Sequence, residues 1–474
     1  GPAIDTASRL ARNHEGVTVD AATATLVGAS CELRPNSDGS AHVTVTRATT
    51  DAPPLATFDA PLFGRDHELA RLLRSADDAV EQLQPKAVTV LGAAGIGKSR
   101  LRHEAVLRLQ ERHPGATSLV LRCEAFRRDT PFAALRDALA RVVDADVTAV
   151  FDAKDAGGGD PVAALDRTRA ALYAVFEALS ERGPVALVID DAQWLDPSSQ
   201  ATVRWVRERA QDLPLVIWVF GRPEATSAAT ELAGAGVSVD LDPLDRVSAG
   251  QLLRAVAPEA PEVILDRAGG NPLFIESLGR LFPLGSAADG EPDALPPSVE
   301  GACLTQLDQI PVDARELLKR AAVFGRVWWL EGVARLGGDV AALPRLRSAA
   351  LVLPRPKTSR FRGGREFVFK VGVYQEIAYA LLPEAPRGRL HAQAAQWLSE
   401  QPEASPAEVA RHWQLADDSA RAADAYALAA ETASRVADVT ATCAHAARAL
   451  GLTRDPSVRW RALVARDDAL QIGG

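Results

Sequence analysis

The sequence predicts an α/β core built on a parallel sheet, followed by a helical region, a helical module with a two-stranded hairpin, and stacked C-terminal helices. Three observations carry this prediction. Between residues 51 and 225, short apolar runs typical of strands buried on both faces alternate with segments of helical period. A glycine-rich turn lies between a predicted strand and a predicted helix. From residue 226 onward helical period dominates, and two extended segments near residues 351 and 367 interrupt it.

The first 50 residues are expected to form a small α+β piece. A short helical stretch, Ala7–Ala11, precedes residues 41–45, where apolar and polar side chains alternate as in a strand. The proline pair Pro53-Pro54 then breaks the chain. After it, four apolar runs are expected to be the strands of the core sheet: Ala87–Leu91, Ser118–Leu121, Val185–Ile189 and Leu215–Phe220.

A phosphate-binding loop follows the first of these strands. Its residues fit the pattern G-x-x-x-x-G-K-[ST] in full: Gly92, Ala93, Ala94, Gly95, Ile96, Gly97, Lys98 and Ser99. Glycines let backbone N–H groups curl around phosphates, and the helix that follows directs its positive end at them. We expect Lys98 to bridge the β- and γ-phosphates, Ser99 to hold Mg²⁺, and Arg100 to lie among the binding residues. The core is therefore predicted to be a P-loop NTPase.

Two carboxylates follow the third predicted strand. Hydrolysis of a nucleotide needs groups that coordinate the metal ion and orient the attacking water, and carboxylates at this place can do both. Asp190 is expected to coordinate Mg²⁺ through water, and Asp191 to orient the attacking water. The fourth strand is followed by Arg222, whose guanidinium is suited to sensing the γ-phosphate through charge-assisted hydrogen bonds. The alternatives are a solvated turn for the carboxylates and a surface arginine for Arg222.

Composition restricts the class of protein. The formal net charge of −9 disfavours nonspecific binding of nucleic acid. The four cysteines lack the spacing of a metal site and are expected to be reduced thiols, which predicts a cytoplasmic location. The longest apolar runs, such as Pro214–Phe220, are far shorter than the ~20 residues that span a bilayer, so no membrane insertion is expected.

Five parts follow from these patterns. A helical region followed by a two-stranded hairpin predicts a winged helix, and recurring alanine-rich helices predict an α-solenoid resembling tetratricopeptide repeats. The predicted parts are a small α+β segment (1–50), the NTPase core (51–225), a helical lid (226–290), a winged-helix-like domain (291–384) and helical repeats (385–474).

The order of the motifs resembles that of the STAND ATPases, signal-transduction ATPases with numerous domains, and above all a bacterial branch fused to kinase, nucleotide cyclase or transcription-factor domains. The motifs that carry the resemblance are Phe63-Gly64-Arg65-Asp66-His67-Glu68, the phosphate loop, Asp190-Asp191-Ala192-Gln193-Trp194-Leu195-Asp196, Gly221-Arg222-Pro223-Glu224 and Gly270-Asn271-Pro272-Leu273-Phe274.

This resemblance implies roles that the residue patterns alone do not give. It places Gly64 and Arg65 near the base and ribose, makes Arg222 the first sensor, and packs Pro272 of the lid on adenine. It also implies that the winged helix locks the lid over ADP and that the C-terminal repeats receive the signal. The alternatives are a surface salt bridge of Arg65 with Asp66 or Glu68, and a loop proline at position 272.

The chain departs from the family pattern at two positions. Relatives commonly have a histidine in the second winged-helix strand, where this chain has Val371 after Lys370. Relatives also tend to have a histidine where this chain has Gln193, and hydrolysis is expected to survive that change if Asp191 is the base.

The first 50 residues resemble the tail of a class III nucleotide cyclase, with Asp5 in the place of the family's asparagine and Arg9 in the place of its arginine. Cyclase activity of this segment is not expected.

The sequence therefore predicts an ATP- and ADP-binding switch that hydrolyses ATP, slowly or only on assembly into an oligomer, to regulate an attached or partner effector. The runner-up is a scaffold in which the nucleotide is a structural plug and the C-terminal helices bind a partner protein. A third hypothesis is a DNA-binding regulator that uses the basic stretch Arg355, Lys357, Arg360, Arg362 and Arg365. The acidic net charge favours a solvated hairpin loop for that stretch.

Overall fold

The computed structural model describes residues 18–19, 31–35, 41–46, 61–142, 161–281, 298–355 and 359–473. It divides into two compact units, Gly1–Asp59 and Ala60–Gly474. In the first unit, three short strands form an antiparallel sheet in the order β1-β3-β2: β1 (Thr18–Val19), β2 (Cys31–Pro35) and β3 (Ala41–Thr46). The strand expected at residues 41–45 is thus confirmed, whereas Asp5 and Arg9 lie outside the described residues.

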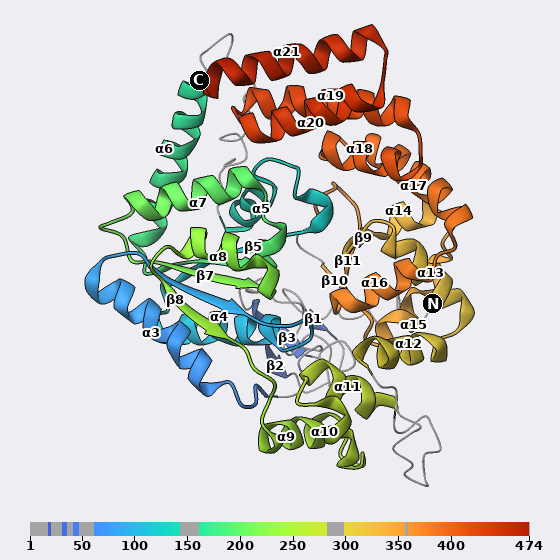
Figure 1. Ribbon diagram of the computed structural model, residues 1–474. Helices are drawn as coiled ribbons and strands as arrows, with labels where there is room; N and C mark the ends of the chain where they lie inside the picture. Colours follow the sequence, from blue (N-terminus) through green and yellow to red (C-terminus); the bar gives the residue numbers. More distant parts are fainter. Residues whose placement is uncertain are drawn as a thin grey trace. The chain divides into compact units, whose positions relative to one another are not determined.

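The second unit contains a five-stranded parallel sheet, as the apolar runs predict. Its strands pair in the order β5-β6-β7-β4-β8 (Figure 1). All four expected strands are present: β4 (Lys86–Leu91), β5 (Thr117–Arg122), β6 (Val185–Asp190) and β7 (Leu215–Gly221). Because the strands are parallel, the carboxyl ends of β4, β6 and β7 meet at one edge of the sheet.

The fifth strand corrects the prediction of helices throughout residues 226–285. Helix α8 (Thr226–Ala233) is followed by β8 (Val237–Asp240), which pairs with β4 and so extends the sheet. Only Val239 of this strand is buried, so β8 lacks the continuous apolar run that marks the other four. A side chain at Gly236 would lie 2.6 Å from the Ala87 carbonyl, which shows how closely the chain approaches β4 here.

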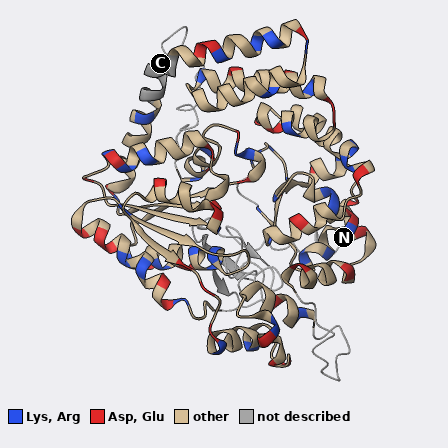
Figure 2. Cartoon of the chain, in the orientation of Figure 1, with Lys and Arg blue, Asp and Glu red and all other residues tan. Residues whose placement is uncertain are grey.

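Helices cover both faces of this sheet. On one face α3 (Asp66–Gln82) and α4 (Lys98–Arg112) pack on Val88, Val188 and Trp218. The other face packs on α5 (Ala133–Val142), α6 (Pro161–Ser180), α7 (Pro197–Arg209) and α8. Figure 2 shows that the strands between these layers carry hardly any charge, as strands buried on both faces must.

Three short helices follow the sheet: α9 (Arg246–Val256), α10 (Val263–Ala268) and α11 (Pro272–Leu281). They share a small apolar cluster of their own that includes Leu253, Ile264 and Ile275. These helices lie within residues 226–290, the range predicted as the lid, and we call residues 246–281 the lid for this reason. Its last helix begins at Pro272, and Asn271 separates this proline from the glycine pair Gly269 and Gly270, whose φ values are +54° and +75°.

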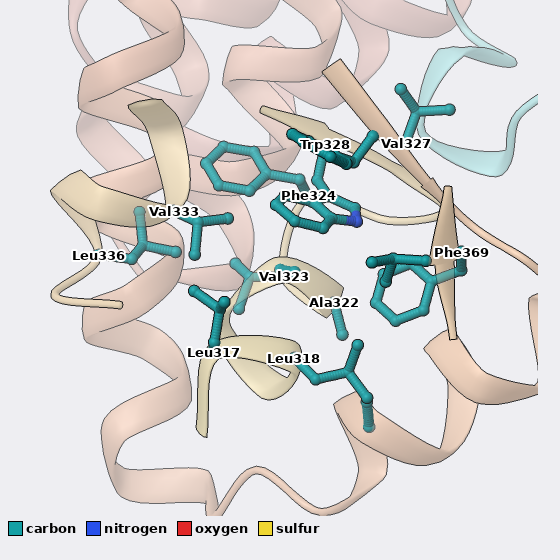
Figure 3. Close-up of a cluster of buried hydrophobic side chains, with 14 of the residues drawn as sticks. Leu317, Leu318, Ala322, Val323, Phe324, Val327, Trp328, Val333, Leu336 and Phe369 are labelled. Atoms are coloured by element: carbon teal, nitrogen blue, oxygen red, sulfur yellow. The ribbon is translucent and has the colours of Figure 1, made fainter. Parts of the chain in front are cut away.

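The next module combines helices with a three-stranded antiparallel sheet in the order β10-β11-β9. The two expected strands are present as β10 (Val352–Pro354) and β11 (Glu366–Phe369), and a third, β9 (Val327–Trp329), was not predicted. The helices are α12 (Val299–Gln309), α13 (Val312–Ala322), α14 (Leu330–Arg335), α15 (Leu343–Ser348) and α16 (Gly372–Ala380). We call residues 298–380 the second module. Its interior side chains converge between α13, α14 and the strands (Figure 3).

Five helices complete the chain, and each packs on the next: α17 (Glu384–Ser399), α18 (Pro406–Leu415), α19 (Ser419–Arg435), α20 (Val439–Leu452) and α21 (Pro456–Gly473). Alanines such as Ala427, Ala430 and Ala446 are fully buried between them, which lets the helices approach closely. Helix α19 also contacts α21, so alternate helices are neighbours (Figure 1).

The second module and the first C-terminal helices share one hydrophobic core. Trp329 and Phe361 of the module pack on Trp397 of α17, with ring centroids 5.8 and 5.3 Å from the Trp397 ring. An ion pair that is nearly buried also connects the two parts: Arg360 of the second module lies 2.6 Å from Glu408 of α18. Full burial of one such side chain contributes about 1.5–3 kcal/mol, so the two parts are expected to move as one body.

The segment that follows β5, residues 123–132, connects the sheet domain to the C-terminal helices, and we call it the β5 hook. Phe126 stacks on His412 of α18 at 5.2 Å between ring centroids. Asp129 forms an ion pair of 2.6 Å with Arg448 of α20. Outside the β5 hook, a further contact between the sheet domain and the C-terminal helices joins Ser198 of α7 to Asp438, the N-cap residue of α20.

Asp196, the N-cap residue of α7, gives the stability of the fold a pH dependence. Its carboxylate accepts hydrogen bonds from the backbone N–H groups of Ser199 and Phe132 at 2.8 and 2.9 Å. Burial raises the pKa of Asp196 from its ordinary value of 3.8 to about 6, against the effect of these hydrogen bonds and with a further contribution from Asp438. Because the pKa is raised in the folded chain, the folded state holds the proton more tightly, and stability is lost as pH rises from about 4 to about 6.

Asp196→Asn keeps the helix cap and removes the titration. We expect the variant to gain stability relative to the wild type as pH rises from 4 to 7, by up to roughly 2–3 kcal/mol. Urea denaturation of both proteins across this range measures the difference. Parallel pH profiles for the two proteins would contradict the expectation.

Two further findings bear on the class of protein. Within the described part of the chain, no helix is both long enough and apolar enough to cross a membrane. Cys123, Cys303 and Cys443 are free thiols, as the sequence predicts.

Candidate functional site

The phosphate loop connects the end of β4 to the start of α4 and has the backbone shape that its sequence predicts. Gly95 and Gly97 have φ values of +77° and +103°, a region that side-chain-bearing residues seldom adopt. Lys98 is the first residue of α4, a helix of 15 residues whose N-terminus faces the loop. Together, the turned backbone and the positive helix end form a cradle suited to phosphate groups.

Lys98 is buried at the centre of the site. Its ammonium group donates to the carbonyls of Gly92 and Ala93, both at 2.8 Å. Burial lowers the pKa of Lys98, and the negative charges of Asp191 and Asp190 oppose this shift. The four charged residues predicted for the site therefore interact electrostatically at one edge of the sheet, since Arg222 also acts on Lys98.

Asp190 ends β6 and is buried beside α4. Its carboxylate lies 3.2 Å from the Nε atom of Arg102, a residue that sequence reasoning did not identify. Ser99 follows Lys98 in the first turn of α4. A hydroxyl and a carboxylate are ligands that Mg²⁺ accepts when phosphate oxygens and water complete its octahedron, so the residues present fit this ion. Ser99 and Asp190 would hold Mg²⁺, which would supply positive charge to neutralise the phosphates.

Asp191 lies at the turn after β6 and is held by two side chains. Its backbone adopts the left-handed conformation with φ of +57°. One carboxylate oxygen accepts from the Gln193 amide at 3.2 Å, and the other accepts from Arg326 of the second module at 2.5 Å. Partial burial lowers the pKa of Arg326, but the charges of Asp191 and Asp190 outweigh it and raise the pKa overall. The predicted base is thus in an ion pair with a residue 135 positions away.

Arg222 follows β7 and is likewise paired with the second module. Its guanidinium lies 3.0 Å from the carboxylate of Glu376 in α16, and its backbone N–H donates to Gln193 at 3.3 Å. Gln193 therefore links Asp191 to Arg222. The side chains of Arg222 and Glu376 are 35% and 56% exposed, so their ion pair is weaker than the less exposed pair of Arg326 with Asp191.

The lid contacts the phosphate loop directly. Asn271 donates its side-chain amide to the Ala94 carbonyl at 3.2 Å, and the backbone N–H of Leu273 donates to the Gly95 carbonyl at 3.2 Å. A side chain at Gly95 would lie 2.8 Å from the Cβ atom of Leu273, so glycine is required there by the lid as well as by its φ. The ring of Pro272 lies 3.8 Å from where a side chain at Gly97 would begin, so the start of α11 is next to the phosphate loop. The start of α11 therefore packs directly on the phosphate loop.

Gly64 and Arg65 precede α3 and contact elements that surround the phosphate loop. A side chain at Gly64 would lie 2.4 Å from the hydroxyl of Ser248, so glycine permits close approach to α9. Arg65 is 5% exposed and donates to the carbonyls of Ile96 at 3.2 Å and Asp242 at 2.6 Å. It also pairs with Glu68 at 3.0 Å, the partner that the sequence analysis offered as an alternative.

Arg65→Lys tests whether this residue supports the loop or contacts the base. A single ammonium group cannot satisfy two carbonyls and Glu68 as a planar guanidinium does. We expect ATP and GTP affinities to fall by the same factor, about 10-fold, because an unsatisfied buried carbonyl costs about 1–3 kcal/mol. Competition titrations with both nucleotides give the measurement. A change in the preference between ATP and GTP would assign Arg65 to base recognition instead.

Arg100 faces charged groups on two elements. It lies 3.3 Å from Glu104 on its own helix and interacts electrostatically with Glu276 of the lid. Glu276 also lies 3.7 Å from Lys370 of the second module. Arg100 is therefore placed where the loop, the lid and the second module meet.

Four residues of this site were missed by sequence reasoning: Arg102, Arg326, Glu376 and Asn271. Arg326 and Glu376 come from a module far along the chain, and an arginine and a glutamate in helical modules give no local signal. Asn271 precedes Pro272 in a motif that the sequence analysis did quote, so it could have been found as a residue that caps α11. Its side-chain oxygen indeed accepts from the Phe274 N–H at 3.2 Å.

Comparison with known families and structures agrees with this geometry. Residues 61–219 match the family model of the AAA ATPase domain, a stretch that contains the phosphate loop and both carboxylates. Among curated proteins, the chain is 26% identical over 382 residues to an uncharacterized protein of Rhizobium meliloti (strain 1021). That alignment covers 70% of this chain and 36% of the relative, so the chain spans about a third of the length of that protein.

Solved structures extend the likeness beyond the core. A signal transduction ATPase with numerous domains and a tetratricopeptide repeat sensor, from Pyrococcus horikoshii, aligns with a TM-score of 0.53 and 14% identity over 87% of this chain and 57% of that one. The two chains therefore share a fold of parallel α/β sheet and helical C-terminal region. The ORC1 protein of Aeropyrum pernix in complex with DNA aligns over 69% of this chain and 95% of that one at 17% identity, with a TM-score of 0.38 that is too low to assign a shared overall fold.

Proposed function

We propose that this chain is a signalling switch that binds ATP and ADP and hydrolyses ATP slowly to control an attached or partner effector. One observation carries the proposal: a complete phosphate loop lies beside two carboxylates and an arginine, and the lid holds the same loop through Asn271 and Leu273. The matching AAA ATPase domain model supports it. In this proposal Lys98 binds the phosphates, Asp191 orients water and Arg222 senses the γ-phosphate.

The switch would work by differential contacts with the two nucleotides. A ligand shifts a conformational equilibrium only by its difference in affinity for the two states. ATP offers a γ-phosphate to Lys98 and Arg222, whereas ADP does not. Arg222 can reach that phosphate only after leaving Glu376, so ATP and the second module compete for the same guanidinium. Binding of ATP would therefore favour separation of the second module from the core.

A nucleotide-plugged scaffold is the second candidate, and a specific observation favours it. Asp191 and Arg222 are both engaged by the second module, an arrangement in which neither acts on a bound nucleotide. In such a protein the nucleotide would stabilise the fold without turning over. The C-terminal helices would then serve as the binding surface for a partner protein.

A single-turnover assay separates the two candidates. The protein is mixed in excess with γ-labelled ATP and Mg²⁺, and release of labelled phosphate is followed for several hours. A switch releases one phosphate per bound ATP, whereas a plug retains intact ATP. Lys98→Ala provides the control for contaminating hydrolases. The absence of release from protein that has bound ATP would reject the switch.

The second module and the C-terminal helices complete the proposal as a winged-helix-like regulator and as tetratricopeptide-like repeats that receive a protein or ligand signal. Binding of nucleic acid by the basic hairpin receives little support, because acidic partners occupy the arginines that the structure describes there. Arg355 pairs with Glu366, Arg360 with Glu408, Arg362 with Glu403 and Arg365 with Glu331. Lys357 lies outside the described residues.

A further inference from the structure

Gln193 lies between the ends of two neighbouring strands of the parallel sheet. It belongs to the short turn Ala192–Trp194 that follows β6, and its side chain reaches the first residue after β7. The amide nitrogen donates to the Asp191 carboxylate at 3.2 Å, and the amide oxygen accepts from the Arg222 N–H at 3.3 Å. One side chain therefore contacts both the residue assigned to water and the residue assigned to the γ-phosphate.

The two partners determine which end of the amide faces which way. A carboxylate only accepts hydrogen bonds and a backbone N–H only donates, so the Gln193 nitrogen faces Asp191 and its oxygen faces Arg222. The reverse orientation would direct an oxygen at a carboxylate and an NH₂ group at an N–H. The side chain at position 193 therefore needs one donor and one acceptor, which neither an aliphatic nor an ionised acidic side chain supplies.

The backbone on both sides holds this amide in place. The N–H of Trp194 donates to the Asp191 carbonyl at 2.9 Å, which closes the turn after β6. At the end of β7, a side chain at Gly221 would begin 3.6 Å from the Gln193 oxygen. The Gly221 carbonyl in turn accepts from the N–H of Gly92, the first residue of the phosphate loop, at 3.2 Å. The amide thus lies where the ends of β6 and β7 meet the phosphate loop.

The sheet itself does not depend on Gln193. Strands β6 and β7 pair along their length, from Val185 with Leu215 to Ile189 with Val219, and both strands are buried. The Gln193 side chain is only partly buried and lies beyond this ladder. Loss of its two hydrogen bonds is therefore expected to disturb the geometry of the site and to leave the fold intact.

We propose that Gln193 is a positioning residue for hydrolysis, which fixes the Asp191 carboxylate beside the attacking water and holds the backbone of Arg222 where its guanidinium can meet the γ-phosphate. This inference rests on the proposed function and adds a residue to it. A base must stay within hydrogen-bond distance of its water, and small misplacements of a reacting group lower rates strongly. Since Gln193 acts through two other residues, its loss lowers the rate of hydrolysis far more than the affinity for ATP.

Three substitutions in the full chain test this role. Gln193→Met roughly keeps the length of the side chain and removes both hydrogen bonds, whereas Gln193→Glu keeps the acceptor and loses the donor whenever the new carboxyl is ionised. Gln200→Met is the matched control, because the Gln200 amide of α7 also donates to a carboxylate, that of Glu231 in α8, at 2.8 Å. Each protein is assayed for its unfolding transition, for equilibrium binding of ATP, and for single-turnover phosphate release across a range of pH.

We expect Gln193→Met to release phosphate about 30-fold more slowly than the wild type, while its affinity for ATP changes by less than about 3-fold. Gln200→Met is expected to match the wild type in both measurements. The loss in Gln193→Met should shrink to less than about 5-fold in the Asp191→Asn background, because most of the effect passes through the carboxylate.

The pH profile of Gln193→Glu gives an independent measurement. The ratio of its rate to the wild-type rate is expected to rise as pH falls, because a protonated carboxyl again donates to Asp191 while a carboxylate repels it. The charged groups around this pair are the same in both proteins, so the ratio isolates position 193: Lys98, Asp190, Arg222, Glu224, Arg326 and Glu376.

An unchanged rate of phosphate release in folded Gln193→Met would reject the positioning role, and so would a loss of ATP affinity as large as the loss of rate. Equal losses with and without Asp191→Asn would also reject it. If Gln193→Met does not fold, Gln193→Glu decides, and a ratio that stays constant or falls as pH falls overturns the inference. Wild-type protein that binds ATP but releases no phosphate would instead reject the proposed function, and this inference with it.

Discussion

Lys98→Ala is expected to lose binding of ATP and of ADP by about 100-fold, a larger loss of affinity than we expect from Arg65→Lys. The ammonium group lies at the centre of the phosphate loop, where it bonds the Gly92 and Ala93 carbonyls and interacts with both carboxylates. Charge-assisted hydrogen bonds are each worth about 1.5–3 kcal/mol, and a loss of about 2.7 kcal/mol is a factor of about 100 in affinity. Equilibrium binding of a fluorescent ATP analogue provides the measurement.

The control for Lys98→Ala separates binding from folding. Truncation removes a buried charge but also two hydrogen bonds to the loop, so the unfolding transition of the apo variant must be compared with that of the wild type. Lys98→Arg restores the charge with a bulkier group and is expected to recover only part of the affinity. If a folded Lys98→Ala protein bound ATP with wild-type affinity, residues 92–99 would not be the nucleotide-binding site.

Asp191→Asn is expected to retain ATP while hydrolysis falls by about 10²–10⁴-fold. General-base catalysis by a positioned side chain contributes a factor of that size. Asparagine tolerates the left-handed backbone at position 191, where φ is +57°, so the turn should keep its shape. Single-turnover phosphate release, compared with retention of ATP after gel filtration, gives the two quantities needed.

A normal rate of hydrolysis in Asp191→Asn would show that another group orients the water. The substitution also weakens the ion pair with Arg326, because a neutral amide pairs less strongly than a carboxylate. Arg335→Ala removes the ion pair of the second module with Glu400 at 3.2 Å and provides the control for effects that do not depend on position 191.

The features predicted from the sequence are those whose signal is local. The four apolar strand runs each pack on both faces of the sheet, and the phosphate loop fits its pattern between β4 and α4, so a short window of residues determines each. The short strand β8 was missed because only Val239 is buried in it, and its pairing with β4 depends on a tertiary contact. The third strand of the second module, β9, was missed for a similar reason, since its three residues continue directly into α14.

The partners of the site residues could not be predicted. Arg326 and Glu376 reach the site from positions more than 130 residues beyond Asp191 and Arg222, and no periodicity or spacing encodes which ion pairs such separated residues will form. Arg65 illustrates the same limit. The structure places its guanidinium on the carbonyls of Ile96 and Asp242, 31 and 177 positions away, and no local pattern encodes these contacts. Its place near the base and ribose stays a prediction.

Isothermal titration of the wild-type chain with Mg²⁺ and ADP, and in parallel with a non-hydrolysable ATP analogue, tests most directly whether residues 92–99 hold a nucleotide. The account predicts saturable heat with close to one nucleotide per chain for both ligands. A chain that is folded by its unfolding transition, free of copurified nucleotide by absorbance, and yet gives no heat with either ligand would contradict it.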